Sequence, residues 1–137
     1  MLERVLMTVV TLGYSLVPTL ADLNWTHATN PLWTGHARYH VVWQVSSYIL
    51  IAALGLYLIW TPGPTADERF LIATGIAVAV YGGFFTALGT MGAYEGQLAD
   101  TNGVPSVTIF GVTIDLNVLV FVVLILFLVA SQIAFWR

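Results

Sequence analysis

The sequence predicts an all-α membrane protein, a single domain in which four transmembrane helices form a bundle. Apolar residues make up 58% of the 137 residues, charged residues only 8%, and the mean hydropathy is +0.87. A soluble domain carries roughly 25% charged residues. Each of the four apolar stretches is about 19–24 residues long, enough for a helix to cross roughly 30 Å of hydrocarbon.

The first two helices are expected at residues 2–20 and 36–60. The first contains Pro18, which lacks an amide hydrogen, so we expect a bend there. Its end resembles a signal-peptide cleavage site, but we expect the segment to be retained as a helix. The second helix ends at Pro62-Gly63-Pro64, a sequence that cannot continue a helix.

The third helix is expected at residues 66–94. Thr65 and Glu68 have the spacing of a capping box, in which each side chain accepts from the other residue's amide. Small residues recur along this helix, and small residues let membrane helices approach closely. We therefore expect it to be the most buried helix. The small residues are Gly75, Ala79, Gly82, Gly83, Thr86, Gly89 and Thr90.

The fourth helix is expected at residues 116–136, with Asp115 as its N-cap. Residues 118–129 contain no polar side chain, so this helix should face lipid over much of its surface. Before it, residues 106–114 alternate β-branched side chains around Gly111. This pattern predicts a short β-hairpin over the mouth of the bundle, in the last extracytoplasmic connection. Asp100, beside Asn102 and Gly103, is typical of a turn.

The arginines predict the orientation. If the N-terminus is cytoplasmic, Arg4, Arg69 and Arg137 are cytoplasmic and only Arg38 is outside. Arginine accumulates on the cytoplasmic side, so we expect an integral membrane protein of the bacterial inner-membrane type with both termini cytoplasmic. Aromatic residues flank the expected spans, as at membrane interfaces.

Composition also excludes several functions. The chain has no lysine and only four arginines, so it offers no basic patch for nucleic acid. It has no cysteine, which excludes disulfides, thiolate catalysis and cysteine-ligated metal sites. No charged side chain falls in the middle of an expected helix, which argues against a proton pump, an ion channel or a voltage sensor.

Residues 22–44 contain all three histidines of the chain. His36 and His40 are four residues apart, so they share one face of a helix, and Gln44 continues that face. If Asn30 caps this helix and Pro31 takes its first position, both histidines lie near the helix N-terminus. His27 lies in the preceding connection and can fold back toward them.

Asp22 and Glu95 end the first and third helices at the depth of the histidines. One hypothesis is a transition metal ion (zinc, copper, iron or manganese) bound by His27, His36, His40 and Asp22. A metal-free hypothesis makes His36, His40 and Glu95 acid–base groups acting on a hydrophobic substrate from the bilayer. Asn30, Arg38 and Gln44 would support either site.

Structural interpretations stay open beside these. The histidines can be interfacial residues bonded to loop carbonyls, and Asp22 can cap a helix or pair with Arg38. Glu95 can be a solvated helix end. Tryptophans 25, 33 and 43 fit interface anchors better than a cofactor site.

The block from Thr26 to His40 reads Thr-His-Ala-Thr-Asn-Pro-Leu-Trp-Thr-Gly-His-Ala-Arg-Tyr-His and resembles a signature of small, largely uncharacterised four-helix membrane proteins. The layout resembles DoxX-like proteins and, more distantly, the sterol-isomerase and sigma-2-receptor group. That group implies a lipid-accessible pocket lined by acidic residues. Here the acids stand at expected helix ends, so we do not carry over its substrate or catalytic residues.

Two functional hypotheses result. In the first, a pocket on the extracytoplasmic side binds a metal ion or a small hydrophobic ligand and can transform it. In the second, the chain is an accessory subunit whose apolar fourth helix docks on a larger membrane complex. Expected partners are membrane lipids, a hydrophobic small molecule, and further copies of the chain or a membrane complex.

Overall fold

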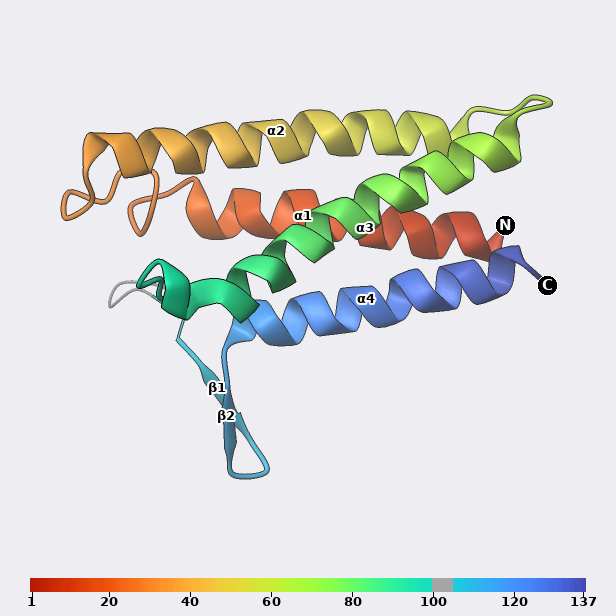
Figure 1. Ribbon diagram of the computed structural model, residues 1–137. Coiled ribbons are helices and arrows are strands. Elements are labelled where there is room, and N and C mark those ends of the chain that lie inside the picture. Colours follow the sequence, from red (N-terminus) through yellow and green to blue (C-terminus); the bar gives the residue numbers. More distant parts are fainter. Residues whose placement is uncertain (100–104) are drawn as a thin grey trace.

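A computed structural model describes residues 1–99 and 105–137 (Figure 1). Asp100, with its expected turn, lies outside these residues. The four predicted helices and the predicted hairpin are confirmed. The elements in order are α1 (Leu2–Asp22), α2 (Gly35–Trp60), α3 (Ala66–Thr90), the 3-10 turn η1 (Met91–Ala93), β1 (Val107–Ile109), β2 (Val112–Ile114) and α4 (Leu116–Phe135).

Successive helices run in opposite directions, so the bundle has two distinct ends (Figure 1). Both chain termini and the turn at residues 61–65 lie at one end, which we call the termini end. Residues 23–34, η1 and the β-hairpin lie at the other, the hairpin end. The helices at Leu2–Asp22, Gly35–Trp60, Ala66–Ala93 and Leu116–Phe135 are long and apolar enough to cross a membrane.

Helix α1 forms the centre of the bundle. It contacts α2 and α4 extensively and also touches α3, whereas α3 and α4 have few contacts. The side chains of Met7, Val10 and Tyr14, three or four residues apart, are almost completely buried. That spacing places them on one stripe of the helix. The prediction that the third helix is the most buried is therefore wrong, because α1 has the largest buried share and α3 the smallest.

The glycines explain this difference. A Cβ added at Gly13 would meet the Leu124 side chain at 2.5 Å, and one at Gly55 would lie 3.2 Å from Thr11 and Tyr14. Close helix approach in this bundle therefore depends on glycines of α1 and α2. The glycines of α3 behave differently, since a Cβ added at any of them would have no atom within 4 Å. These are Gly75, Gly82, Gly83 and Gly89.

Side-chain hydrogen bonds join the helices through the middle of the bundle and at the termini end. The Tyr81 hydroxyl donates to the Val10 carbonyl at 2.8 Å, which joins α3 to α1. The Ser131 hydroxyl donates to the Glu3 carbonyl at 2.8 Å, which joins α4 to α1. Further bonds run from Arg4 to the Ile59 carbonyl (2.6 Å), from Trp60 to Thr8 (2.9 Å) and from Gln132 to Thr74 (3.0 Å).

The helix caps agree with the sequence at one position and differ at another. Asp115 caps α4 as predicted, because its carboxylate accepts from the Asn117 amide at 2.8 Å. Thr65 precedes α3, but the capping box is wrong: its hydroxyl accepts from the Arg69 guanidinium at 2.6 Å and caps no amide. A charged donor one turn away replaces the neutral amide, because a hydrogen bond from a charged group is the stronger.

The start of α2 also differs from the prediction. Thr34 is the N-cap, and its hydroxyl accepts from the Ala37 amide at 3.2 Å. Asn30 instead accepts from the Leu32 amide at 3.0 Å and donates to the Thr26 carbonyl at 2.8 Å. An asparagine side chain that accepts from the amide two residues ahead forms a turn, so the chain changes direction there before the helix starts. Asn30 is 1% exposed and holds the connection together from inside.

The prediction that the β-hairpin lies over the mouth of the bundle is wrong. It projects sideways from the bundle, roughly across the direction of the helices (Figure 1). Its two strands pair antiparallel, with Thr108 opposite Thr113. Because β2 is followed at once by Asp115 and α4, the hairpin stays at the level where α4 begins.

Candidate functional site

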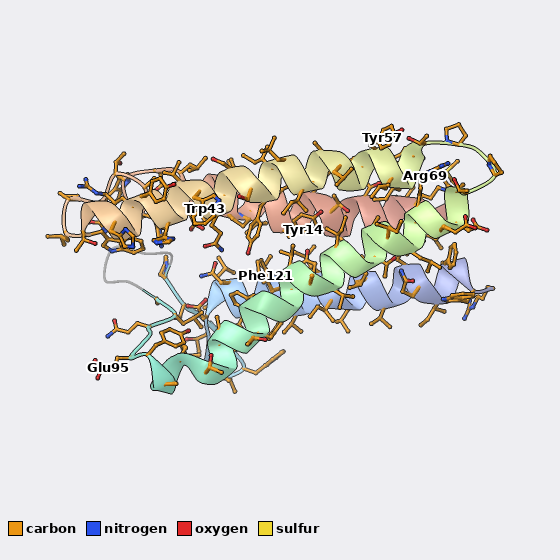
Figure 2. All side chains as sticks on the ribbon, turned by 45° about the horizontal axis from the view of Figure 1, so that its top comes forward. Tyr14, Trp43, Tyr57, Arg69, Glu95 and Phe121 are labelled. Carbon is orange, nitrogen blue, oxygen red and sulfur yellow. The ribbon has the colours of Figure 1, made fainter. Side chains whose placement is uncertain are left out.

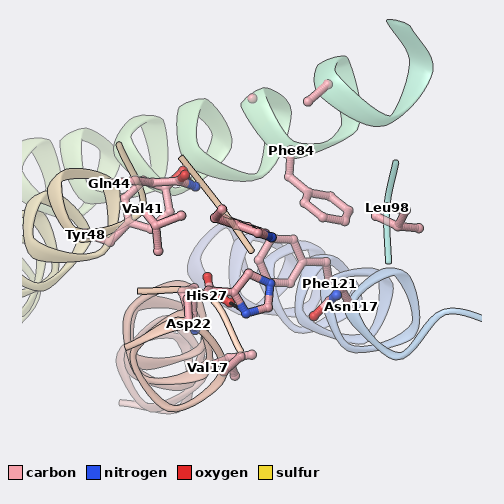
Figure 3. Close-up of a pocket in the computed structure, with 15 residues that line it drawn as sticks. Val17, Asp22, His27, Val41, Gln44, Tyr48, Phe84, Leu98, Asn117 and Phe121 are labelled. Carbon is pink, nitrogen blue, oxygen red and sulfur yellow. Dashed lines mark hydrogen bonds and ion pairs between the residues drawn. The ribbon is translucent and has the colours of Figure 1, made fainter. Parts of the chain in front are cut away.

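A cavity of about 350 Å³ lies at the hairpin end, among all four helices (Figure 3). Binding pockets for small molecules are typically mostly apolar, with a few convergent polar groups. This cavity has that character. Its apolar lining includes Val17, Pro18, Ala21, Trp33, Val41, Phe84, Ala87, Leu98 and Phe121, and its polar lining is Asp22, His27, Gln44, Tyr48 and Asn117.

Asp22 and His27 form the titratable part of the lining. The Asp22 carboxylate lies 3.8 Å from His27 Nδ1, close enough for an ion pair when the imidazole is protonated, and both side chains are partly buried. Figure 3 shows the two groups together between α1 and the other walls. The alternative that Asp22 pairs with Arg38 is wrong. Among the described residues, the ion-pair partner of Asp22 is His27.

The connection after α1 orients His27. The Thr26 hydroxyl lies 2.7 Å from His27 Nδ1 and 2.6 Å from the Asn24 side-chain oxygen. If that hydroxyl donates to Asn24, its oxygen can accept from Nδ1–H, and Nε2 of a neutral ring is then left as an acceptor. The backbone folds back as well, because the Ala28 amide donates to the Asp22 carbonyl at 3.0 Å. The tight turn thus returns His27 to the end of its own helix.

Trp33 and Gln44 extend the site toward α2. The Trp33 ring meets His27 edge to face, with ring centroids 5.0 Å apart, so this tryptophan is part of the cavity wall and more than an interface anchor. The Gln44 amide donates to the Tyr48 hydroxyl at 3.2 Å, one helical turn along α2. Gln44, expected as a supporting residue, therefore does line the same cavity as His27.

Several lining residues were not predicted. Asn117 stands at the start of α4, ahead of its long apolar stretch, and could have been noticed as a polar residue at that helix start. Tyr48 could have been found as the next step of the face that His40 and Gln44 share. Phe84 and Phe121, whose ring centroids are 4.4 Å apart, carry no such signal. Their role depends on how α3 crosses α4.

His36 and His40 lie outside the cavity. Their Nε2 atoms are 3.0 Å apart, with ring centroids at 4.4 Å, so they share a helix face as predicted. That face is exposed to the surroundings, and His40 also stacks on Trp43 with a centroid distance of 5.8 Å. Neither histidine lines the cavity. The histidines of residues 22–44 therefore form two separate groups.

Glu95 and Arg38 are also apart from His27. Glu95 is exposed just beyond η1, at a backbone φ of 55°, and Figure 2 shows it at the far end of α3, away from the labelled Trp43 of α2. It fits the solvated helix end that we kept as an alternative. Arg38 is half-buried on α2 and is absent from the cavity lining.

The predicted single cluster of imidazoles and carboxylates is thus divided. Within residues 1–99 and 105–137, no three histidine, aspartate or glutamate side chains come close enough together to hold one metal ion. One ion shared by His27, His36, His40 and Asp22 is unsupported for this reason. Sequence spacing identified the His36–His40 pair but not the Asp22–His27 pair, which arises from the tight turn after α1 that brings His27 back to Asp22.

A second hollow of about 330 Å³ lies at the termini end, lined by residues that include Glu3, Arg4 and Asp67. Two of its charged groups already have partners. The Glu3 carboxylate lies 2.6 Å from the N-terminal ammonium, and Arg4 donates to the Ile59 carbonyl. We regard the cavity at the hairpin end as the better candidate, because it joins a titratable pair to apolar walls.

The chain matches no protein-family model, no curated protein and no solved structure. The likeness to DoxX-like proteins therefore stays a prediction, and the functional argument depends on the geometry of this chain.

Proposed function

We propose that the protein is an integral membrane protein of the bacterial inner-membrane type, with both termini cytoplasmic. The helices present large apolar side chains outward, among them Leu50, Leu54 and Leu126, each at least half exposed. Such surfaces suit lipid and not water. The arginine distribution supports the orientation. In intact cells, a membrane-impermeant maleimide should label Thr29→Cys but not Glu68→Cys; the reverse pattern would refute the orientation.

Within that membrane, we propose that the cavity at the hairpin end binds a small molecule with an apolar body and a hydrogen-bond donor. The observation that carries this proposal is the Asp22–His27 pair in a cavity with largely apolar walls. The carboxylate accepts hydrogen bonds, and so does a neutral imidazole nitrogen. A volume of about 350 Å³ lies at the small end of the range for ligand pockets.

The ligand enters from the bilayer, between α2 and α3. The lining residues of α1 and α4 are buried or half-buried, whereas Gln44 of α2 and Gly83 and Ala87 of α3 are exposed. In Figures 1 and 2, α3 diverges from α2 toward the hairpin end. An opening on this side favours a ligand dissolved in lipid. If the protein transforms its ligand, His27 is the acid–base group and Asp22 orients it.

A matched pair of substitutions on α3 tests the cavity. Gly83 lines it, and its neighbour Gly82 does not, yet both are exposed and neither has an atom within 4 Å of an added Cβ. Leucine at residue 83 should therefore fill the cavity, while leucine at residue 82 should leave it open. The probe is N-phenyl-1-naphthylamine, a neutral apolar amine whose fluorescence rises in apolar sites, added to protein held in amphipol.

We expect saturable probe binding by the unmodified protein and by Gly82→Leu, and loss of binding in Gly83→Leu. Asp22→Asn should weaken binding of the amine, because it removes the carboxylate charge. His36→Ala is its control, since His36 lies outside the cavity. Equal binding by both leucine variants would show that the probe does not use this cavity, and the proposal would fail.

The accessory-subunit hypothesis has its own supporting observation. Gly75, Gly82 and Gly89 recur every seven residues on α3, and all three are exposed with open space beside them. A small-residue face of this kind favours close packing of another membrane helix, from a second copy or a larger complex. This points to α3 as the docking helix in place of α4. Under this hypothesis Gly82→Leu, harmless to the cavity, should reduce the size of the native complex on blue native gels.

A further inference from the structure

The β-hairpin is amphipathic. Thr108 and Thr113 are opposite each other and their hydroxyl oxygens are 3.2 Å apart, so they form one polar face. Side chains alternate along a strand, so Val112 and Ile114 share the other face, and Val107 is paired with Ile114. Residues 105–114 include no charged side chain. The hairpin therefore has an apolar face and an uncharged polar face.

The apolar face is uncovered at Val107 and Val112, and Ile114 is half-buried. Val112 is 59% exposed and Val107 38%, and the hairpin contributes no residue to the cavity lining. Its strands pair with each other and project away from the helices (Figure 1). In water an exposed, uncharged, β-branched strand pair is a site of aggregation. An environment that is apolar on one side only would remove this liability.

Phe110 at the tip strengthens the argument. It is fully exposed, at 103%, and adopts a φ of 49°, followed by Gly111 at 80°. Positive φ at both central residues defines the type I′ turn, which favours asparagine or aspartate followed by glycine. A bulky aromatic residue at positive φ is strained, because its Cβ approaches the following carbonyl oxygen. The turn thus has a large apolar residue where a small polar one would be more stable.

We infer that the hairpin is an interfacial anchor, whose apolar face and Phe110 insert into the outer leaflet of the bilayer beside the bundle. The inference rests on the proposed membrane insertion. The hairpin leads directly through Asp115 into α4, whose outward side chains include Val122 and Leu126, so it adjoins a helix that presents apolar side chains outward. Because it runs across the helices, it lies along the membrane plane at the outer interface (Figure 1).

The position of the hairpin in the membrane affects the cavity. Asn117, which lines the cavity, follows the hairpin by three residues and donates its amide to the cap Asp115. The hairpin therefore fixes the height of the start of α4, and with it one wall of the cavity, relative to the lipid surface. An apolar face in the interface lies roughly 5–10 Å below the headgroup boundary.

The absence of cysteine in the chain permits single-site labelling. We would place a nitroxide at Phe110→Cys, Val112→Cys, Thr113→Cys and Leu126→Cys, each in the full chain reconstituted into phosphatidylcholine vesicles. Oxygen, which concentrates in lipid, and a water-soluble nickel chelate would compete to relax the label. We expect labels at 110, 112 and 126 to favour oxygen, and the label at 113, on the polar face, to favour nickel.

Three other outcomes would overturn the inference. Labels at 110 and 112 that are as open to nickel as the one at 113 would place the hairpin in water. Labels at 110 and 112 shielded from both reagents would place a second protein copy on that face. A label at 126 that favours nickel would refute membrane insertion itself, so the two proposals fail by different readings.

A further variant separates anchoring from turn strain. Phe110→Asn suits the type I′ turn better than phenylalanine, so the hairpin should persist. It removes the apolar tip, however, so a label at Val112→Cys in this background should move toward the headgroups. An unchanged depth would mean that Phe110 does not anchor the hairpin.

Discussion

The two ends of the bundle differ in how their helices are joined. From the middle to the termini end, side chains bond between helices: Tyr81 to α1, Ser131 to α1 and Gln132 to α3. At the hairpin end, the hydrogen bonds around the cavity are local, as between Gln44 and Tyr48 of α2 or Asn30 and Thr26 of one connection.

This difference has a functional meaning. Bonds between helices hold the helices at fixed distances, whereas local bonds shape each segment and leave the spacing between helices open. The termini end therefore acts as the fixed base from which α3 diverges. The cavity lies where α3 diverges from α2, beyond the point at which Tyr81 bonds α3 to α1 (Figures 1 and 2).

The largest effect should come from removing a buried side chain at the point where the helices are joined. Tyr81 is 1% exposed, and its ring meets Tyr14 and Phe121 edge to face. Tyr81→Ala leaves a void and an unpartnered Val10 carbonyl, so the free energy of unfolding should fall by about 3 kcal/mol or more. Unfolding in mixed micelles with increasing sodium dodecyl sulfate measures it.

Phe84→Ala is the matched change at the cavity. Phe84 is one turn along α3 and half-buried; its ring packs on Phe121 and also lines the cavity. We expect a loss of about 1 kcal/mol, smaller than for Tyr81→Ala because Phe84 is only half-buried. If the two alanine variants lost equal free energy of unfolding, both ends would be packed alike and the proposed difference between them would be wrong.

A smaller effect should come from two glycines. Gly13→Ala places a methyl group 2.5 Å from the Leu124 side chain, and Leu124 is itself buried and has little room to move. We expect a net loss of about 1 kcal/mol, since overpacking outweighs the gain in helix propensity. In Gly82→Ala nothing opposes the gain, so stability should rise by about 0.5 kcal/mol. The same unfolding titration measures both, and destabilisation by Gly82→Ala would show that α3 packs more tightly than we describe.

The sequence predicted the elements better than their packing. The apolar stretches and the turn residues located all four helices to within a few residues, since a helix of this kind is determined by its own residues. Asp115 was recognisable as a cap for the same local reason. The capping box predicted for Thr65 was wrong, because the Thr65 hydroxyl accepts from Arg69 instead. Nothing in the Thr65–Glu68 spacing indicates that donor.

The site was predictable in part. Asp22, His27 and Gln44 were identified, and the structure brings them to one cavity. His36, His40 and Glu95 were grouped with them because helix counting gave the same depth, but depth does not specify the direction around each helix. Burial of α3 was misjudged because small residues permit close packing without requiring it, as the open space around Gly75 and Gly89 demonstrates.

The smallest expected effect concerns a metal ion at the hairpin end, and it tests the division of the histidines. Two imidazole nitrogens bound to one tetrahedral zinc ion at about 2.0–2.1 Å lie about 3.3 Å apart. His36 and His40, with Nε2 atoms 3.0 Å apart on an exposed face, can approach this geometry with a small adjustment. Only two protein ligands are present there, so water must complete the coordination, and binding should be weak.

Calorimetric titration of chelator-stripped protein with zinc measures this binding. We expect His40→Ala to abolish it and His27→Ala to leave it unchanged, and lower pH to weaken it because protons compete for the same nitrogens. Probe binding in the cavity should respond in the opposite way, losing strength in His27→Ala alone. If His27→Ala and His40→Ala impaired zinc binding equally, the imidazoles would meet at one ion after all. His27 would then have to reach the exposed face of α2 that carries His36 and His40, which requires the hairpin end to close further than it does in this structure.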